Sequence, residues 1–317
     1  MSGKKIITVF GATGNQGGSV VDIFLNDPKF KNDWAVRGIT RDVNKESSKK
    51  LTSQGVEVVA ADINDKASIT EAIKGSYAVY AMTNYWEYMD MNIEIQQGKN
   101  MADAAKDAGV KLLIWSSILN VTKLSNGVLS EVYHFDSKAT VEQYIRELGI
   151  PATFFLPGFY MTNLPGQAFR PSPPDNAWTL GLPIPSKAIF PMFYPADTGK
   201  YIKAAVLHES EVLGKRLLAS SEYLTGQEVV DGFKRAYPAQ AASARYRQQP
   251  DEEFRGFLKG QGMPDFAVEE LHQNMRLLDE FGYYGGDSLK WTHSLVEDHL
   301  TTWEEYAKTA PEFAGAK

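Results

Sequence analysis

The chain has 317 residues, a formal net charge of −6 and no cysteine. Its length suits one large α/β domain or a domain with a smaller lobe, whereas its acidic balance argues against direct binding of nucleic acid. The absence of cysteine excludes disulfides, thiolate catalysis and sulfur-ligated zinc. No apolar run approaches the roughly 18 residues of a membrane span, and the first strand follows Met1 too closely for a signal peptide. We therefore expect a protein of the cytoplasm, with the nucleus as a second location, that binds no membrane.

A glycine-rich turn is the first informative motif. It follows an apolar, β-branched stretch at 6–10, and a helical pattern of apolar residues begins at 19. Strand, glycine turn and helix open a Rossmann unit, in which backbone N–H groups approach a pyrophosphate at the helix N-terminus. The spacing G-x-x-G-x-x-G is typical of short-chain dehydrogenases, although a tight structural turn is the alternative interpretation. The residues predicted to bind a dinucleotide here are Gly11, Ala12, Thr13, Gly14, Asn15, Gln16 and Gly17.

The end of the second predicted strand, at 34–40, indicates which dinucleotide binds. An NAD site would carry an acidic residue here to hold the ribose 2′-hydroxyl, but the residue after the strand is Arg41. A guanidinium can bind the 2′-phosphate of NADP through charge-assisted hydrogen bonds, and Lys45 can assist it. The alternative is that Arg41 begins a solvated, basic helix. We favour NADP(H) as the cofactor.

Strands and helices alternate through the first half of the chain. Further strands are predicted at 56–62, 78–82, 110–115 and 152–156, and helices at 68–74, 92–108 and 137–148. This alternation predicts a parallel, doubly wound sheet, whose ligands bind beyond the C-terminal ends of the strands. The groups expected on that rim are the glycine turn, Arg41, Asp62, residues 83–85 and Ser116-Ser117.

The character of the sequence changes after the sixth strand. Nine of the 15 prolines fall between 157 and 195, which predicts loops and short strands. Helices are predicted at 198–207, 226–237, 264–281 and 303–308. The predicted fold class is therefore α/β, with an NADP-binding Rossmann domain at 1–156. A smaller C-terminal α+β lobe at 157–317 is expected to be interleaved with the sheet rather than independent.

The catalytic residues depart from the dehydrogenase pattern. Short-chain dehydrogenases place a Tyr-x-x-x-Lys pair on the helix after the fifth strand, but here His134 stands four residues before Lys138. Tyr133 is one residue out of register, which turns it by roughly 100° on a helix. His134 could replace the tyrosine as an acid, since imidazole titrates near neutral pH, or it could simply bond to backbone at the helix start. The other histidines show no metal-ligand spacing, so no metal site is expected.

Several segments resemble the NmrA-like family of atypical short-chain dehydrogenases, and its NADPH-sensing branch in particular. They are residues 9–20, Thr40-Arg41, Thr83-Asn84-Tyr85-Trp86-Glu87, Gln97-Gly98-Lys99, His134-Phe135-Asp136-Ser137-Lys138 and Trp303-Glu304-Glu305-Tyr306. The resemblance implies that the glycine loop carries the dinucleotide, that Arg41 takes the 2′-phosphate and that Lys138 holds the ribose. It also implies contacts from Asp62, Ile63, Met82, Thr83, Asn84, Tyr85, Pro157, Gly158, Phe159 and Tyr160.

The resemblance implies two functions, because the family divides. Some members read the NADPH/NADP ratio and bind regulatory protein partners such as transcription factors, whereas others are oxidoreductases that act on small organic molecules. We favour a redox sensor that acts through a protein partner. The alternative is an NADPH-dependent oxidoreductase of a small organic substrate, with His134 in place of the usual tyrosine.

Overall fold

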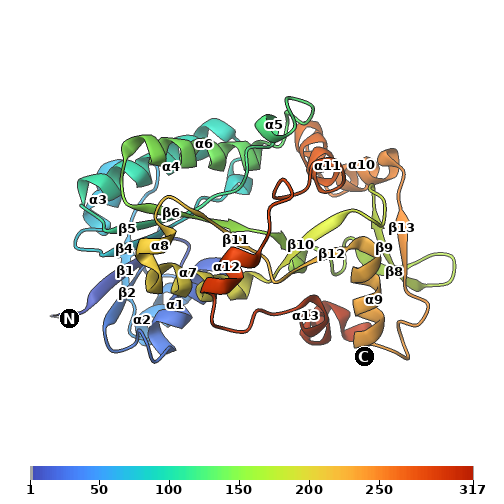
Figure 1. Cartoon of the computed structure of the whole chain (residues 1–317), viewed down its shortest axis with the longest axis horizontal. Coiled ribbons are helices and arrows are strands. Elements are labelled where there is room, and N and C mark those ends of the chain that lie inside the picture. The colour runs from blue at the N-terminus through green and yellow to red at the C-terminus, as the bar shows by residue number, and fades with distance from the viewer. Residues whose placement is uncertain (1–2, 317) are drawn as a thin grey trace.

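A seven-stranded parallel sheet organises the computed structural model, which describes residues 3–316 (Figure 1). Its strand order is β11-β6-β5-β4-β1-β2-β3. The first six strands along the chain are β1 (Lys5–Val9), β2 (Trp34–Thr40), β3 (Glu57–Ala60), β4 (Ala78–Ala81), β5 (Leu112–Ser116) and β6 (Ala152–Pro157). All neighbouring strands of this sheet run parallel, which confirms the predicted fold class.

Helices cover both faces of the sheet. They are α1 (Asn15–Asn26), α2 (Glu46–Ser53), α3 (Lys66–Ala72), α4 (Met91–Asp107), α5 (Val121–Leu124), α6 (Tyr133–Leu148) and α7 (Thr198–Leu207). Figure 1 shows α3, α4 and α6 on one side and α1, α2 and α7 on the other, and the buried apolar side chains form two clusters. The strand order reverses between β1 and β4, so the turn after β1 lies where such sheets bind ligands. No helix in the described part of the chain is both long and apolar enough to span a membrane.

The second half of the chain forms a smaller lobe and also returns to the main sheet. β11 (Arg216–Ala219) pairs with β6, and α7 packs on α1. The lobe contains two three-stranded sheets, β12-β10-β7 and β13-β9-β8. Its strands are β7 (Phe159–Tyr160), β8 (Phe169–Ser172), β9 (Ala177–Leu182), β10 (Ile189–Phe193), β12 (Glu222–Thr225) and β13 (Arg245–Gln248). The remaining helices are α8 (Glu209–Val212), α9 (Gly226–Ala236), α10 (Asp251–Gly260), α11 (Asp265–Glu280), α12 (Lys290–Leu295) and α13 (Trp303–Thr309).

The structure differs from the predicted elements in identifiable places. The helix predicted to begin at 137 begins at Tyr133, because Glu270 of the second lobe accepts the backbone N–H of His134 in its first turn. Helix α2 enters the sequence analysis only as the alternative interpretation of Arg41, because its sequence ESSKKLTS contains one apolar residue, Leu51, and so has no hydrophobic periodicity. Strand β11 was not predicted because only four residues pair with the edge of the sheet.

A buried lysine fixes α7 to α1 and to the segment before α13. The Lys203 side chain is 5% exposed, and its Nζ lies 2.6 Å from Asp27, 2.8 Å from Glu297 and 3.2 Å from Asp298. Burial alone would raise the pKa of Asp27, but hydrogen bonds from Lys203 and Lys29 lower it overall. Bonds from Lys203 and Lys29 also lower the pKa of Glu297, to about 2. Both carboxylates are therefore ionised over the whole neutral range.

Replacing Lys203 with methionine should lower the free energy of unfolding at neutral pH by about 2–4 kcal/mol, because Asp27 would lose its buried cation. A carboxylate whose pKa is lower in the folded state than in the unfolded state stabilises the fold at pH values above its unfolded-state pKa. This stabilisation is lost as the pH falls through the folded-state pKa. The loss of unfolding free energy in Lys203→Met, measured by urea denaturation, should therefore shrink as the pH falls from about 5 towards 2. Lys29→Met, which removes a half-exposed partner of Glu297, is the control and should cost less than about 1 kcal/mol. A deficit that stays constant with pH would contradict the role assigned to these carboxylates.

Candidate functional site

The glycine turn after β1 has the geometry of an anion site. Gly11 has a φ of +66°, a conformation that favours glycine. A Cβ atom on Gly17 would overlap the carbonyl oxygen of Gly11, so helix α1 packs directly on the turn only because this position is glycine. The N-cap of α1 is Gly14, which has no side chain to cap the free N–H groups of the first turn. A pyrophosphate therefore fits at this helix start, by charge and by hydrogen bonding.

Within the turn, Gln16 serves the fold. Its side chain is buried, accepts a hydrogen bond from the Tyr80 hydroxyl at 2.8 Å and donates to the Tyr160 hydroxyl. This chain of contacts joins the glycine turn to β4 and to β7. Burial raises the pKa of Tyr160 well above its usual range, so this phenol stays protonated and keeps a proton to donate.

A cleft of about 280 Å³ lies beyond the ends of β1, β2, β3 and β4. Eight residues predicted to bind the cofactor line it: Gly11, Thr13, Arg41, Lys45, Asp62, Ile63, Met82 and Asn84. Its other lining residues are Phe10, Ile39, Thr40, Ser47, Ala61, Asn64, Glu87, Tyr88 and Gln97. The lining combines apolar walls and amides with two cations, Arg41 and Lys45, and two carboxylates, Asp62 and Glu87, which suits a nucleoside that carries a phosphate. Sequence reasoning missed Glu87, whose carboxylate forms an ion pair with Arg41.

Lys138 points from α6 to the end of β4. Its Nζ donates to the backbone oxygen of Thr83 at 3.0 Å and to the Thr83 hydroxyl at 2.9 Å, and it forms an ion pair with Glu94 of α4. Glu94 is 2% exposed and also accepts hydrogen bonds from the hydroxyls of Thr83 and Ser137. No sequence pattern indicates this partner, since a glutamate in the first turn of a helix is ordinary.

His134 is held by a carboxylate from the second lobe. Its Nδ1 lies 2.6 Å from Oε1 of Glu270, which also accepts the His134 backbone N–H at 2.7 Å. The Tyr85 hydroxyl donates to the other oxygen of Glu270 at 2.8 Å. Glu270 is fully buried, and burial followed by this hydrogen bond raises the pKa of Tyr85 well above its usual range. With Glu270 as the acceptor, this contact is made by the His134 tautomer that carries its proton on Nδ1, which leaves Nε2 as the other ring nitrogen.

Most of the remaining predicted residues lie in packed surroundings. Ser117 donates to buried Glu142 at 2.6 Å. Phe159 is 8% exposed and packs edge-on against Phe190, with the ring centroids 5.1 Å apart. A Cβ atom on Gly158 would overlap the carbonyl oxygen of Pro191, so this stretch is fixed against β10. Ala12 and Ser116 are buried, whereas Asn15 is exposed and Pro157 and Tyr133 are half-buried.

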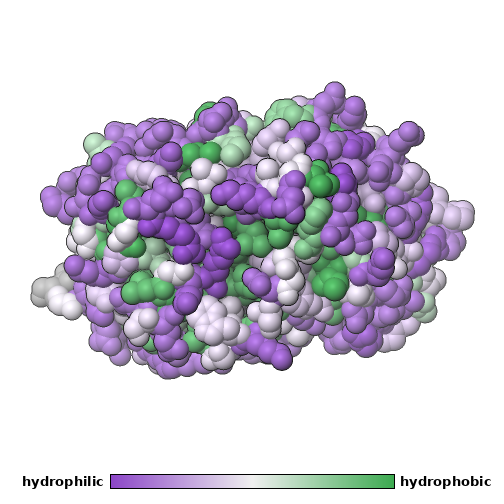
Figure 2. Space-filling model, turned by 45° about the horizontal axis from the view of Figure 1, so that its top comes forward, coloured by the Kyte–Doolittle hydropathy of each residue, from purple (hydrophilic) through white to green (hydrophobic). Residues whose placement is uncertain are grey.

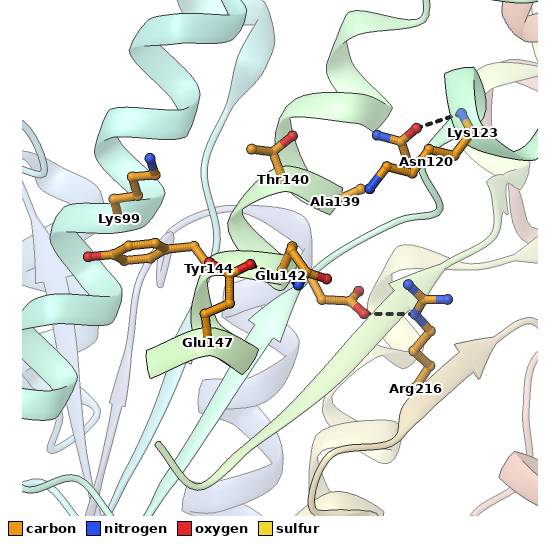
Figure 3. A pocket seen from close by; sticks show the side chains of 10 residues that line it. Lys99, Asn120, Lys123, Ala139, Thr140, Glu142, Tyr144, Glu147 and Arg216 are labelled. Carbon is orange, nitrogen blue, oxygen red and sulfur yellow. Dashed lines mark hydrogen bonds and ion pairs between the residues drawn. The ribbon is translucent and has the colours of Figure 1, made fainter. Parts of the chain in front are cut away.

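A second cleft, of about 320 Å³, lies along the outer face of α6 (Figure 3). Lys99, Lys123 and Arg216 reach it from three different elements, and Arg216 donates to Glu142 at 2.8 Å. None of its lining residues is a predicted cofactor ligand, and the glycine turn is absent from it. Hydrophilic residues cover most of the face in Figure 2, while apolar ones gather in its middle, between the two halves of the molecule. Because eight residues predicted to bind the cofactor line the cleft beyond the strand ends, that cleft is the candidate cofactor site.

Removing the carboxylate beside Lys138 tests the buried pair. Glu94→Ala should lower the free energy of unfolding by about 3 kcal/mol, because a nearly buried ammonium would lose its counter-charge. Glu94→Gln keeps a hydrogen-bond acceptor for Thr83 and Ser137, so its free energy of unfolding should fall less than that of Glu94→Ala. Glu147→Ala on the exposed side of α6 is the matched control, expected within about 0.5 kcal/mol of the parent in urea denaturation. Equal effects of Glu94→Ala and Glu147→Ala would show that Lys138 does not depend on Glu94.

Comparison with known proteins agrees with the motifs. A model of the NmrA-like family matches residues 3–307. An NmrA-like family domain-containing oxidoreductase of Aspergillus campestris is 29% identical over 308 residues, which cover 91% of this chain and 87% of that protein. Another, of Penicillium ochrochloron, is 36% identical over 167 residues that cover 50% of this chain and 48% of that protein. The match thus spans about half the length of this curated relative.

Solved structures share the fold. NmrA, a negative transcriptional regulator, in complex with NADP has a TM-score of 0.78 and 21% identity, and the match covers 98% of this chain and 96% of that chain. The same regulator in complex with NAD has a TM-score of 0.80. Because the family model extends over almost the whole sequence and the predicted fold class is observed, the chain belongs to the NmrA-like family.

Proposed function

We propose that this protein is an NADP(H)-dependent oxidoreductase of a small organic substrate. The observation that carries the proposal is the buried Glu270 carboxylate, which orients His134 one helical turn from Lys138. Carboxylate–histidine pairs of this kind prepare an imidazole for acid–base work. The names of the relatives from Aspergillus campestris and Penicillium ochrochloron, both oxidoreductases, support the same reading.

Residues of the main sheet would hold the cofactor. The start of α1 suits the pyrophosphate and Arg41 and Lys45 suit the 2′-phosphate. Lys138, whose Nζ donates to the backbone oxygen of Thr83 after β4, would bind the ribose hydroxyls. We assign binding of NADP to residues 1–156 and the covering of the substrate to residues 157–317. When bound, this cofactor supplies a hydride to the substrate.

His134 would supply the proton that balances the hydride. From Nε2 it would donate to the substrate atom that gains the electron pair, while Glu270 at Nδ1 stabilises the charged ring before transfer. Glu270 is thus a positioning residue. The Trp86 ring, whose centroid lies 5.0 Å from that of His134, shields one side of the imidazole from water.

A redox sensor is the second candidate, and one contact favours it. Tyr85 belongs to η1 (Tyr85–Glu87), which follows β4, and it donates to Glu270 of α11 in the other lobe. This bond provides a route by which occupancy of the cleft could alter the surface of the second lobe and hence a protein partner. The function would then be regulation in the cytoplasm or the nucleus.

Cofactor binding is tested by calorimetry with NADP and NAD. Arg41→Ala should weaken NADP about ten- to a hundredfold, which corresponds to roughly 1.5–3 kcal/mol for a lost charge-assisted bond, and leave NAD almost unchanged. Gly14→Val should weaken both dinucleotides, because its side chain would stand at the helix start that receives the pyrophosphate. An equal loss of NADP and NAD in Arg41→Ala would show that this arginine is structural.

Turnover is tested by following NADPH oxidation with a panel of carbonyl and enone compounds. His134→Ala should lower kcat about 10²- to 10⁴-fold while NADPH affinity stays intact, whereas Lys138→Ala should lower both. His208→Ala, which removes an exposed histidine paired with Glu211, is the control. If no compound oxidises NADPH, the sensor is favoured, and NADPH and NADP⁺ should then differ in their effect on partner binding. Turnover that survives His134→Ala would place the acid elsewhere.

A further inference from the structure

Glu87 and Arg41 meet above the glycine turn from opposite sides. Arg41 follows β2, whereas Glu87 ends the turn η1 that follows β4, and β1 lies between these two strands. Their ion pair therefore bridges the end of β1, and both side chains line the cleft assigned to the cofactor. Lys45 and Ser47 line the same cleft.

The structure presents the Glu87 carboxylate on an anchored turn. Tyr85, two residues earlier, is 3% exposed and bonded to buried Glu270. The backbone N–H groups of Glu87 and Met89 donate to the oxygens of Asn84 and Tyr85, at 3.2 and 2.8 Å. The Glu87 side chain is 32% exposed, half the exposure of Arg41 at 65%. An exposed ion pair between two mobile side chains stabilises little, but a carboxylate fixed in a ligand cleft affects whatever binds beside it.

A carboxylate at this place has opposite effects on the two dinucleotides. The 2′-phosphate of NADP must share the Arg41 guanidinium with Glu87 or displace it, and the two anions repel each other. NAD instead presents a 2′-hydroxyl, which an acidic residue can accept, and in many Rossmann sites such an acid follows the second strand. No acid ends β2 here, since Arg41 stands first, but the Glu87 carboxylate reaches the Arg41 guanidinium from the turn after β4 and lines the same cleft.

We propose that Glu87 is the residue that sets the balance between NADP and NAD. Its carboxylate weakens binding of the 2′-phosphate of NADP by pairing with Arg41, and it accepts a hydrogen bond from the 2′-hydroxyl of NAD. The protein therefore prefers NADP over NAD less strongly than it would with Arg41 and Lys45 alone. This inference rests on the proposed binding of a nicotinamide dinucleotide in the cleft. It concerns the adenosine end of the site, and is independent of whether the protein turns over a substrate.

Calorimetry of the whole chain tests this with four probes: NADP, NAD, adenosine 2′,5′-bisphosphate and adenosine 5′-monophosphate. Glu87→Gln should bind NADP and the bisphosphate about tenfold more tightly, which is the gain expected when one charge-assisted bond is freed. It should bind NAD a few-fold more weakly and the monophosphate about equally. In the Arg41→Ala background the gain for NADP should fall to about twofold, because there is no guanidinium left to compete for.

Glu46→Gln is the matched control. Glu46 lies beside Lys45 on α2 and pairs with Lys49, but it does not line the cleft, so its loss changes the net charge equally without reaching the site. It should change NADP affinity less than about twofold. Thermal melting of each variant confirms that it is folded, and Glu87 is exposed enough for the substitution to be tolerated.

The outcomes separate this inference from the proposed function. A parent protein that binds neither NADP nor NAD overturns the cofactor assignment itself. A parent that binds dinucleotide, together with a Glu87→Gln variant whose NADP-to-NAD preference is unchanged, overturns only the role of Glu87. A loss of NADP affinity in Glu87→Gln also overturns it, because Glu87 would then be holding Arg41 in place for the phosphate.

Discussion

The buried carboxylate of Glu270 is the constraint on which the site depends. It comes from α11 in the smaller lobe, is fully buried, and receives hydrogen bonds from Tyr85, from the His134 backbone and from the His134 ring. A buried charge without partners is very unfavourable, so the two lobes can pack only with η1 and the start of α6 in place. The same contact explains why α6 begins at Tyr133, and it gives His134 a fixed orientation.

A second buried carboxylate, that of Glu94, forms an ion pair with Lys138. Glu94 balances Lys138 as Glu270 balances the imidazole, so each candidate functional base is matched by an acid from another helix. Such pairing lets these two largely buried basic groups keep polar partners within the fold before any ligand arrives. A ligand that binds Lys138 must then compete with Thr83 and Glu94 for its three N–H groups, which favours ligands with several acceptor oxygens, such as a ribose.

Sequence patterns predicted the sheet and the cofactor end of the site because both depend on local order. Alternating strands and helices fix the parallel sheet, and the carboxyl ends of its strands bring Gly11, Arg41, Asp62 and Met82 to one cleft. Contacts between distant segments escaped prediction. Glu270 lies 136 residues from His134, and no spacing rule connects a glutamate of a C-terminal helix to the start of α6. Gln16, within the glycine motif, could not be distinguished from its neighbours, yet it binds Tyr80 and Tyr160.

The preference between NADP and NAD shows why the residues at the end of one strand are not enough to predict the cofactor. The usual rule examines the end of the second strand, where Arg41 alone indicates NADP. Because the sheet order places β1 between β2 and β4, residues that follow β4 face those that follow β2 across the glycine turn. On the proposed placement of the cofactor, a 2′-phosphate would therefore meet the charges of both loops: Arg41 and Lys45 from one side and Glu87 from the other. We therefore expect a change at the end of the turn after β4 to shift cofactor preference even where the end of β2 is unchanged.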